Sequence, residues 1–313
     1  MSRKIATRDA YGEALVELGR ENPAVVVLDA DLSKSTKTAL FARAFPERFF
    51  NVGIAEQNLM GMAAGLAAAG KIPFASTFAV FATGRAFEQV RNSIAYAGLN
   101  VKIGASHAGI TVGEDGASHQ SVEDLALMRA VPGMTVIVPA DAEETRKAVK
   151  AAAGREGPVY LRLGRAGVPV LFGPDHPFEV GRAVPLREGR DVALLATGVM
   201  VSVALEAADL LQAEGINAEV INIHTLKPLD EEAVVSAARR CGAVVTAEEH
   251  SIIGGLGSAV AEVLAEKNPV PMARVGIRDR FGQSGAPEEL MREYGLTAGD
   301  IAGRAREVLA RKR

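Results

Sequence analysis

The chain has 313 residues, a formal net charge of −3 and a hydrophobic fraction of 48 %. A chain of this length can bury two ordinary hydrophobic cores, so we expect two domains. Neither charge sign forms a long block, which excludes an extended nucleic-acid groove or a basic membrane-facing patch and leaves a small molecule as the expected ligand. The single cysteine, Cys241, excludes an internal disulfide.

The N-terminal residues contain no positively charged and apolar leader, so we expect a cytoplasmic protein. The longest apolar run covers residues 59–69 and is rich in glycine and alanine. It is far shorter than the roughly 20 residues that a bilayer span needs. We therefore expect a buried helix there and no contact with a membrane.

Short β-branched apolar runs alternate with segments of helical period, which is the pattern of parallel βα units whose sheet is covered on both faces. In the first half of the chain these runs predict strands at residues 25–28, 72–76, 101–105, 135–138 and 159–163. Asp141 followed by Glu144 is a capping-box pattern and predicts the start of a helix. The predicted fold class is α/β.

The periodic signal stops between residues 164 and 189, where prolines and glycines accumulate. We expect residues 1–168 to form a first domain, residues 169–189 a linker and residues 190–313 a second, smaller α/β domain. In the second domain the pattern predicts strands at residues 191–196, 218–221, 243–247 and 272–275. Helices are expected near residues 201–213, 230–238, 256–265 and 300–310.

Two segments of the first half hold residue types suited to a binding site. Residues 53–58 place Glu56 in the opening turn of an apolar helix, where a carboxylate must be solvated, paired or functional because burying it alone is costly. An ordinary glutamate favoured by the helix dipole is the alternative. Residues 76–81 end a predicted strand with Phe78 and Phe81, which can face one pocket together or simply pack in the core.

A third segment, residues 106–120, follows the strand predicted at residues 101–105. It contains His107 and His119, two acidic residues and three glycines. Loops at the carboxyl ends of parallel strands are where such sheets bind ligands. We therefore expect a binding or catalytic loop here rather than an ordinary surface loop.

Together with residues 6–8 and 30–35, these three segments resemble the pyrimidine-binding and C-terminal domains of transketolases in their order and spacing. The resemblance extends over nearly the whole chain. It implies a parallel sheet domain of the thiamine-diphosphate-binding type, followed by a smaller α/β domain of the transketolase C-terminal type. It also implies the transfer of a two-carbon ketol unit between phosphorylated sugars.

The resemblance implies a role toward thiamine diphosphate for four residues. Glu56 would hydrogen-bond the 1′ nitrogen of the aminopyrimidine, which lets the neighbouring nitrogen remove the thiazolium C2 proton. Phe78 and Phe81 would pack on the pyrimidine ring, and Asp31 would lie close to the thiazolium. The sequence departs from the family at Gly84, which stands where a third aromatic residue is expected.

For the sugar, the resemblance puts Asp115 near a substrate hydroxyl and His107 and His119 near the reacting oxygens, where an imidazole could donate to a developing alkoxide. A guanidinium binds phosphate with bidentate geometry. The resemblance assigns the terminal phosphate of the substrate to Arg8, Ser35 and Arg165. Taken singly, each arginine is better explained as a solvated or salt-bridged side chain, and only its place in the family pattern favours phosphate binding.

One part of the family's site is missing from the sequence. The magnesium and diphosphate of the cofactor are held by a Gly-Asp-Gly string with a downstream asparagine pair, and the nearest string here, at residues 113–116, has no such pair around residues 140–142. Because the chain starts at Met1 with the Arg8 region already in place, we expect a separate N-terminal transketolase subunit to hold magnesium and diphosphate. We expect no metal site on this chain, self-dimerisation, and a heterotetramer with two copies of each chain.

Three alternatives stay open. A 2-oxo acid dehydrogenase beta subunit has similar length and domain order, and residues 246–258 resemble a region shared with it, but residues 113–119 are of the hydroxyl-reading sugar type. Deoxyxylulose-phosphate synthase shares the scaffold, but it is normally one chain and usually carries arginine where Phe81 stands. A non-catalytic scaffold subunit would not need acids and histidines at the positions named above.

Overall fold

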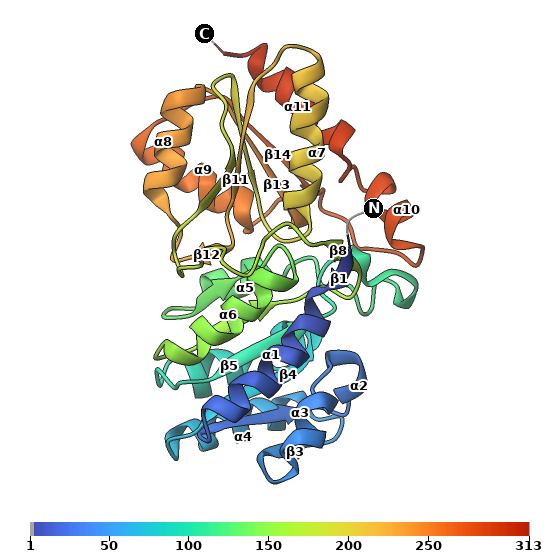
Figure 1. The fold of residues 1–313 in the computed structure, drawn as a ribbon, viewed down its shortest axis with the longest axis vertical. Coiled ribbons are helices and arrows are strands. Elements are labelled where there is room, and N and C mark those ends of the chain that lie inside the picture. Colours follow the sequence, from blue (N-terminus) through green and yellow to red (C-terminus); the bar gives the residue numbers. More distant parts are fainter. Residues whose placement is uncertain (1–2, 313) are drawn as a thin grey trace.

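A computed structural model describes residues 3–312. The first half of the chain, blue to green in Figure 1, lies at one end of the long axis, and the second half, yellow to red, lies at the other. The first half carries a seven-stranded sheet in the order β12-β6-β7-β5-β4-β2-β3, and the second half a five-stranded sheet in the order β14-β13-β10-β11-β9. The predicted α/β class is confirmed.

Six parallel strands make up most of the first sheet. They are β2 (Val25–Asp29), β3 (Phe49–Asn51), β4 (Ile72–Phe78), β5 (Lys102–Ser106), β6 (Thr135–Ile137) and β7 (Val159–Arg162). All the strands predicted here are present, with small shifts at their ends. Every residue of β2, β5 and β7 is buried, as expected for a parallel sheet covered on both faces.

Helices cover the two faces of this sheet. The apolar side chains of α1 (Thr7–Glu21), α3 (Ala39–Ala44) and α6 (Ala142–Gly154) pack on one face. Those of α4 (Glu56–Ala68), α5 (Asp124–Ala130) and the π-helical segment η3 (Gln89–Ala95) pack on the other. The predicted start of α6 is confirmed, since Asp141 accepts a hydrogen bond from the Glu144 N–H. Among residues 3–312, no helix is long and apolar enough to cross a membrane.

The second sheet contains the four predicted strands and one more. They are β10 (Val192–Ala196), β11 (Ala218–Asn222), β13 (Val244–Ser251), β14 (Met272–Ile277) and the additional edge strand β9 (Val184–Arg187). The predicted helices are present as α7 (Met200–Ala213), α8 (Glu231–Cys241), α9 (Leu256–Lys267) and α11 (Ala298–Leu309). The sequence analysis missed α10 (Pro287–Glu293), a short helix that begins at a proline.

The segment between the two sheets is more ordered than predicted. β8 (Gly167–Pro169) pairs with β1 (Lys4–Ala6), and β9 pairs with β11 of the second sheet. The expectation of a wholly irregular stretch was wrong, because edge strands of three or four residues show too little alternation to be recognised.

Farther along, β12 (Thr225–Lys227) returns to the first sheet and pairs with β6. One apolar cluster also spans both sheets, so the two halves share a core.

Candidate active site

Candidate residues from three segments meet at one edge of the first sheet. Asp31 follows β2, Phe78 ends β4 and His107 follows β5. These strands are neighbours and run parallel, so their carboxyl ends lie at the same edge. The Phe78 and His107 rings are stacked, with centroids 3.8 Å apart. The structure therefore brings residues that are distant in sequence into one site.

Two of these residues have a left-handed backbone. Asp31 has φ of 63° and His107 has φ of 57°, a conformation that costs a non-glycine residue on the order of 1 kcal/mol. Asp31 is held by Asn51, which accepts the Asp31 N–H at 3.1 Å and donates its own amide to the Asp31 carboxylate at 2.9 Å. The sequence analysis did not identify Asn51, because its strand β3 is too short to predict. Backbone strain that neighbours hold in place is typical of functional positions.

The two candidate phenylalanines and the two candidate histidines form one ring cluster. Phe78 and Phe81 lie nearly parallel, with centroids 5.7 Å apart. The His119 ring is T-shaped to both, and its centroid lies 6.1 Å from that of Phe78 and 5.6 Å from that of Phe81. Edge-to-face and offset-stacked contacts are the favoured geometries for such rings. The cluster provides a flat apolar surface next to polar nitrogen atoms.

His107 is held as a neutral imidazole. It is 2 % exposed, and Arg8 Nη1 donates to its Nε2 at 2.9 Å. Since a guanidinium has no acceptor, Nε2 carries the lone pair, and Nδ1–H donates to Ser106 Oγ at 2.9 Å. Burial, followed by the charges of Arg8 and Arg165, lowers the pKa of His107 to about 3. With Arg8 in this position, His107 accepts a hydrogen bond at Nε2 rather than donating one.

The three candidate phosphate residues lie close together, although their partners differ from those expected. Arg8 Nη1 donates to the backbone carbonyl of Ser35 at 3.1 Å, while the buried Arg8 Nε has no hydrogen-bond partner among residues 3–312. Burial is the main cause of the lowered pKa of Arg8, and the nearby charge of Arg165 lowers it further. Arg165 pairs with Glu114 at 3.2 Å and lies 4.0 Å from Asp115. Two neighbouring guanidiniums and an orphaned buried N–H suit an anion.

Glu56 opens α4 and is 2 % exposed, as the apolar helix predicted. Both of its carboxylate oxygens lie 3.2 Å from Nη1 of Arg85, whose side chain is 53 % exposed. The Arg85 guanidinium also lies over the Phe81 ring, 4.8 Å from its centroid. Arg85 was not predicted from the sequence. Its signal was available, because it is the only charged residue in the run 78–87.

The contacts of Arg85 show what kind of group fits the space beside Glu56 and Phe81. A guanidinium is flat, donates N–H groups at its edge and stacks on aromatic faces. An aminopyrimidine ring requires the same two surfaces, a buried carboxylate at its edge and an aromatic ring at its face. Glu56 and Phe81 provide both, so these residues fit the pyrimidine half of thiamine diphosphate once Arg85 moves aside. A Cβ at Gly84 would meet no atom of residues 3–312 within 4 Å, so the position is open.

Side chains from the second half of the chain hold the loop 106–120 in place. The buried Glu249 of β13 accepts the Thr111 N–H at 2.6 Å. Gly109 has φ of 80°, and a Cβ there would lie 2.3 Å from the Glu249 carboxyl, so glycine is required. Ser284 Oγ donates to the Glu114 carbonyl at 2.7 Å. The sequence analysis assigned none of these contacts to the site.

A buried ionic network lies beneath this loop. Arg162 Nε donates to Asp124 at 2.8 Å, and Tyr160 donates to the same carboxylate at 2.8 Å. Arg162 Nη2 also donates to the Glu249 carbonyl at 2.9 Å, which ties the first sheet to β13. Among residues 3–312, no group of three or more histidine, cysteine or acidic side chains is arranged to hold a metal ion.

Comparison with known proteins agrees with this geometry. Residues 3–170 match the transketolase pyrimidine binding domain, and residues 181–301 match the transketolase C-terminal domain. The chain is 51 % identical over 308 residues to a putative transketolase C-terminal section of Methanocaldococcus jannaschii, covering 97 % of this chain and 96 % of that protein. It is 49 % identical to the 6-deoxy-6-sulfo-D-fructose transketolase subunit SqwH of a Clostridium species, covering 97 % and 95 %.

A solved structure described as a split gene transketolase, inactive beta4 tetramer, is 64 % identical to this chain and superposes with a TM-score of 0.93. The match covers 99 % of this chain and 100 % of that one. Sequence, fold and domain order therefore agree over almost the whole length. The chain belongs to the transketolase family and contains that family's pyrimidine-binding and C-terminal domains.

Proposed function

We propose that this chain is the C-terminal subunit of a two-chain transketolase. It would transfer a two-carbon ketol unit between sugars once assembled with an N-terminal subunit that holds magnesium and diphosphate. The observation that carries the proposal is the buried Glu56 carboxylate beside the Phe81 ring, occupied by a flat cation that imitates an aminopyrimidine edge. The names of the relatives, a C-terminal section and a subunit, support the division into two chains.

The roles proposed for the residues follow from their positions. Bound thiamine diphosphate supplies a thiazolium carbon that adds to a sugar carbonyl. Glu56 would hydrogen-bond the ring nitrogen of the aminopyrimidine and hold a proton there. Phe78 and Phe81 would orient the ring and exclude water. Asp31 lies at the same sheet edge, where we propose that it faces the thiazolium.

The substrate would lie between the ring cluster and the loop 106–120. We propose that Asp115 binds a sugar hydroxyl and that His119, which lies T-shaped to both phenylalanines, donates to the reacting oxygen. His107 would fix Arg8 rather than donate to the substrate. Arg8, Arg165 and the Ser35 region would bind the terminal anion of the sugar, and Arg165 would exchange its Glu114 partner for it.

Two kinds of terminal anion suit this guanidinium pair, because guanidiniums bind phosphate and sulfonate alike. The SqwH relative carries a sulfonated sugar in its name, and it is 49 % identical to this chain. We propose a phosphorylated sugar as the substrate of this chain. Parallel assays with a phosphorylated and a 6-sulfonated ketose distinguish the two classes.

The proposal is tested by mixing the purified chain with a candidate N-terminal subunit, thiamine diphosphate and magnesium. Xylulose 5-phosphate and ribose 5-phosphate are the donor and acceptor. Turnover should occur in the mixture and in neither chain alone, in keeping with the inactive state named for the tetrameric relative. A well-folded complex without turnover on any sugar would favour a scaffold subunit. Consumption of a 2-oxo acid instead would favour the dehydrogenase beta subunit.

A further inference from the structure

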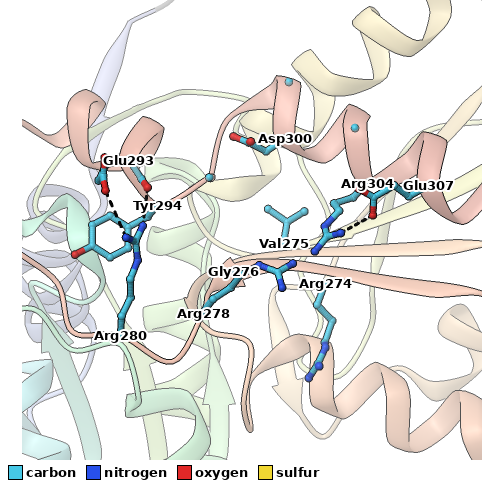
Figure 2. A pocket seen from close by; sticks show the side chains of 13 residues that line it. Arg274, Val275, Gly276, Arg278, Arg280, Glu293, Tyr294, Asp300, Arg304 and Glu307 are labelled. Carbon is cyan, nitrogen blue, oxygen red and sulfur yellow. Dashed lines mark hydrogen bonds and ion pairs between the residues drawn. The ribbon is translucent and has the colours of Figure 1, made fainter.

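A polar pocket lies in the second half of the chain, away from the candidate active site. No candidate active-site residue lines it. Its volume is about 460 Å³, within the range of small-molecule sites. It is formed by the end of β14, the loop that follows, the end of α10 and one side of α11 (Figure 2). The loop after a parallel strand is the usual place for a ligand in this kind of sheet. Four arginines line the pocket: Arg274, Arg278, Arg280 and Arg304.

The acidic residues of the pocket already have partners. Glu293 pairs with Arg280 at 3.4 Å, and Glu307 pairs with Arg304. Asp300 accepts the backbone N–H at the start of α11 in a capping box. Glu293 and Glu307 each neutralise one arginine, and Asp300 makes no ion pair with an arginine among residues 3–312.

Two arginines remain without an acidic partner among residues 3–312. Arg274 donates only to the Ile252 carbonyl, at 2.8 Å, and Arg278 makes no hydrogen bond or ion pair with the described residues. Figure 2 shows the guanidiniums of Arg278 and Arg304 pointing toward one another inside the pocket. Like charges that face each other repel, and an anion between them would be attracted by both.

The backbone around the pocket supports a ligand in the same place. Gly299 and Gly303 lie one turn apart on α11 and line the pocket, and a Cβ on Gly303 would meet no atom of the described residues within 4 Å. Packing therefore does not require glycine there, although each glycine within a helix costs about 1 kcal/mol relative to alanine. The two glycines leave the helix surface bare on the side that faces the arginines. Asp279, with φ of 45°, turns the chain between Arg278 and Arg280 so that both line the pocket.

We propose that this pocket binds a phosphorylated small molecule that carries two or more negative charges. Arg278 and Arg304 would be its main ligands, with Arg274 and Arg280 at the margin. The segment that begins at Arg278 continues to Ser284, which donates to the carbonyl of Glu114 in the candidate substrate loop. An occupant of the pocket would thus order the same segment that supports the substrate loop.

Isothermal titration of the full chain with inorganic pyrophosphate tests the proposal, with inorganic phosphate as the less charged comparison. Pyrophosphate should saturate one site per chain at this pocket, apart from any anion bound at Arg8 and Arg165, and should bind there more tightly than phosphate. Arg278→Ala and Arg304→Ala should each weaken binding about tenfold, the loss expected for one charge-assisted contact. Arg239→Ala, an exposed arginine on α8, is the matched control and should change nothing.

Arg165→Ala separates this pocket from the candidate active site and should leave pyrophosphate binding unchanged. Hydrogen exchange should slow in residues 278–286 when pyrophosphate is added to the wild type, and should not slow in Arg278→Ala. The proposal is overturned if no saturable binding occurs, or if binding survives both pocket substitutions and is lost in Arg165→Ala. Because neither partner nor turnover is needed, the result does not depend on the proposed transketolase activity.

Discussion

The carboxylate of Glu56 has only one cationic partner among the described residues, and that partner comes from the π-helical segment η2 (Phe81–Arg85). Single-turn π segments inside helices are frequent at functional sites. Arg85 satisfies the buried charge of Glu56 in the isolated chain, and we propose that the aminopyrimidine does so in the assembled enzyme. Arg85 and the cofactor would then compete for one carboxylate.

Arg85→Ala should therefore strengthen binding of a pyrimidine ligand to the chain. Thiamine is the probe, because it lacks the diphosphate that a partner would hold, and titration calorimetry measures its affinity. We expect a several-fold increase, together with a loss of about 1–2 kcal/mol in the free energy of unfolding, because Glu56 is buried while Arg85 is half exposed. Arg91→Ala, another exposed arginine in the same region, is the control. Equal or weaker thiamine binding in Arg85→Ala would contradict the competition.

His107 should not titrate between pH 5 and 8. The pKa of this histidine is lowered to about 3 from an ordinary value of 6.5. Between these values the unfolded chain binds a proton that the folded chain does not, so His107 contributes stability above pH 6.5 that is lost as the pH falls. NMR of the imidazole resonances, assigned with His107→Asn, measures this directly. A midpoint near pH 6.5 for His107 would show that Arg8 does not hold it neutral.

At the level of elements, the loop 106–120 depends on β13. Glu249 accepts the Thr111 N–H from the buried side of this loop, so we expect it to position Asp115 without touching the substrate. Glu249→Ala should lower kcat/KM of the assembled enzyme by about tenfold to a hundredfold, the cost of one hydrogen bond to a charged group. This loss should come mainly from a higher KM, with little change in kcat. Glu249→Gln keeps an acceptor oxygen and should recover most of the loss, whereas equal kcat/KM in all three proteins would exclude the positioning role.

Because of Glu248, the fold should be more stable in mild acid than at neutral pH. Its buried carboxyl accepts the N–H groups of Leu256 and Gly257 at 2.7 Å, yet desolvation raises its pKa from 4.5 to about 7. Between these pH values the folded chain binds a proton that the unfolded chain does not. Stability from this group therefore falls as the pH rises from about 4.5 to about 7. Urea unfolding of the wild type and Glu248→Gln across this range should show a steeper decline in the wild type; parallel curves would contradict the raised pKa.

The elements that the sequence predicted are those with a long periodic signal. The strand of residues 25–28 and the helix near residues 256–265 were predicted because apolar runs and helical spacing extend over most of their length. The edge strands β3, β9 and β12 were not predicted, because pairing with a neighbour, rather than their own residues, makes them strands. Tertiary context decides short elements of this kind.

Across the whole molecule, the candidate site also divides into residues with a local sequence signal and contacts that depend on tertiary structure. Glu56, Phe78 and His107 could be predicted because they lie in local motifs that resemble a family. The contacts that hold them could not, since Arg85 reaches Glu56 across 29 residues and Glu249 reaches Thr111 across 138. The strand β12 and the shared apolar cluster join the two halves into one body, so the second half takes part in shaping the substrate loop.

The central claim is that Glu56 of this chain activates a cofactor whose diphosphate is held by another chain. Exchange of the thiazolium C2 proton of thiamine diphosphate with deuterium, followed by NMR in the assembled complex, measures that activation without substrate. We predict fast exchange in the wild-type complex and in the exposed-acid control Glu47→Gln. Exchange should be about a hundredfold slower or more in Glu56→Gln, the size of a general acid–base contribution. Unchanged exchange in Glu56→Gln would contradict the account.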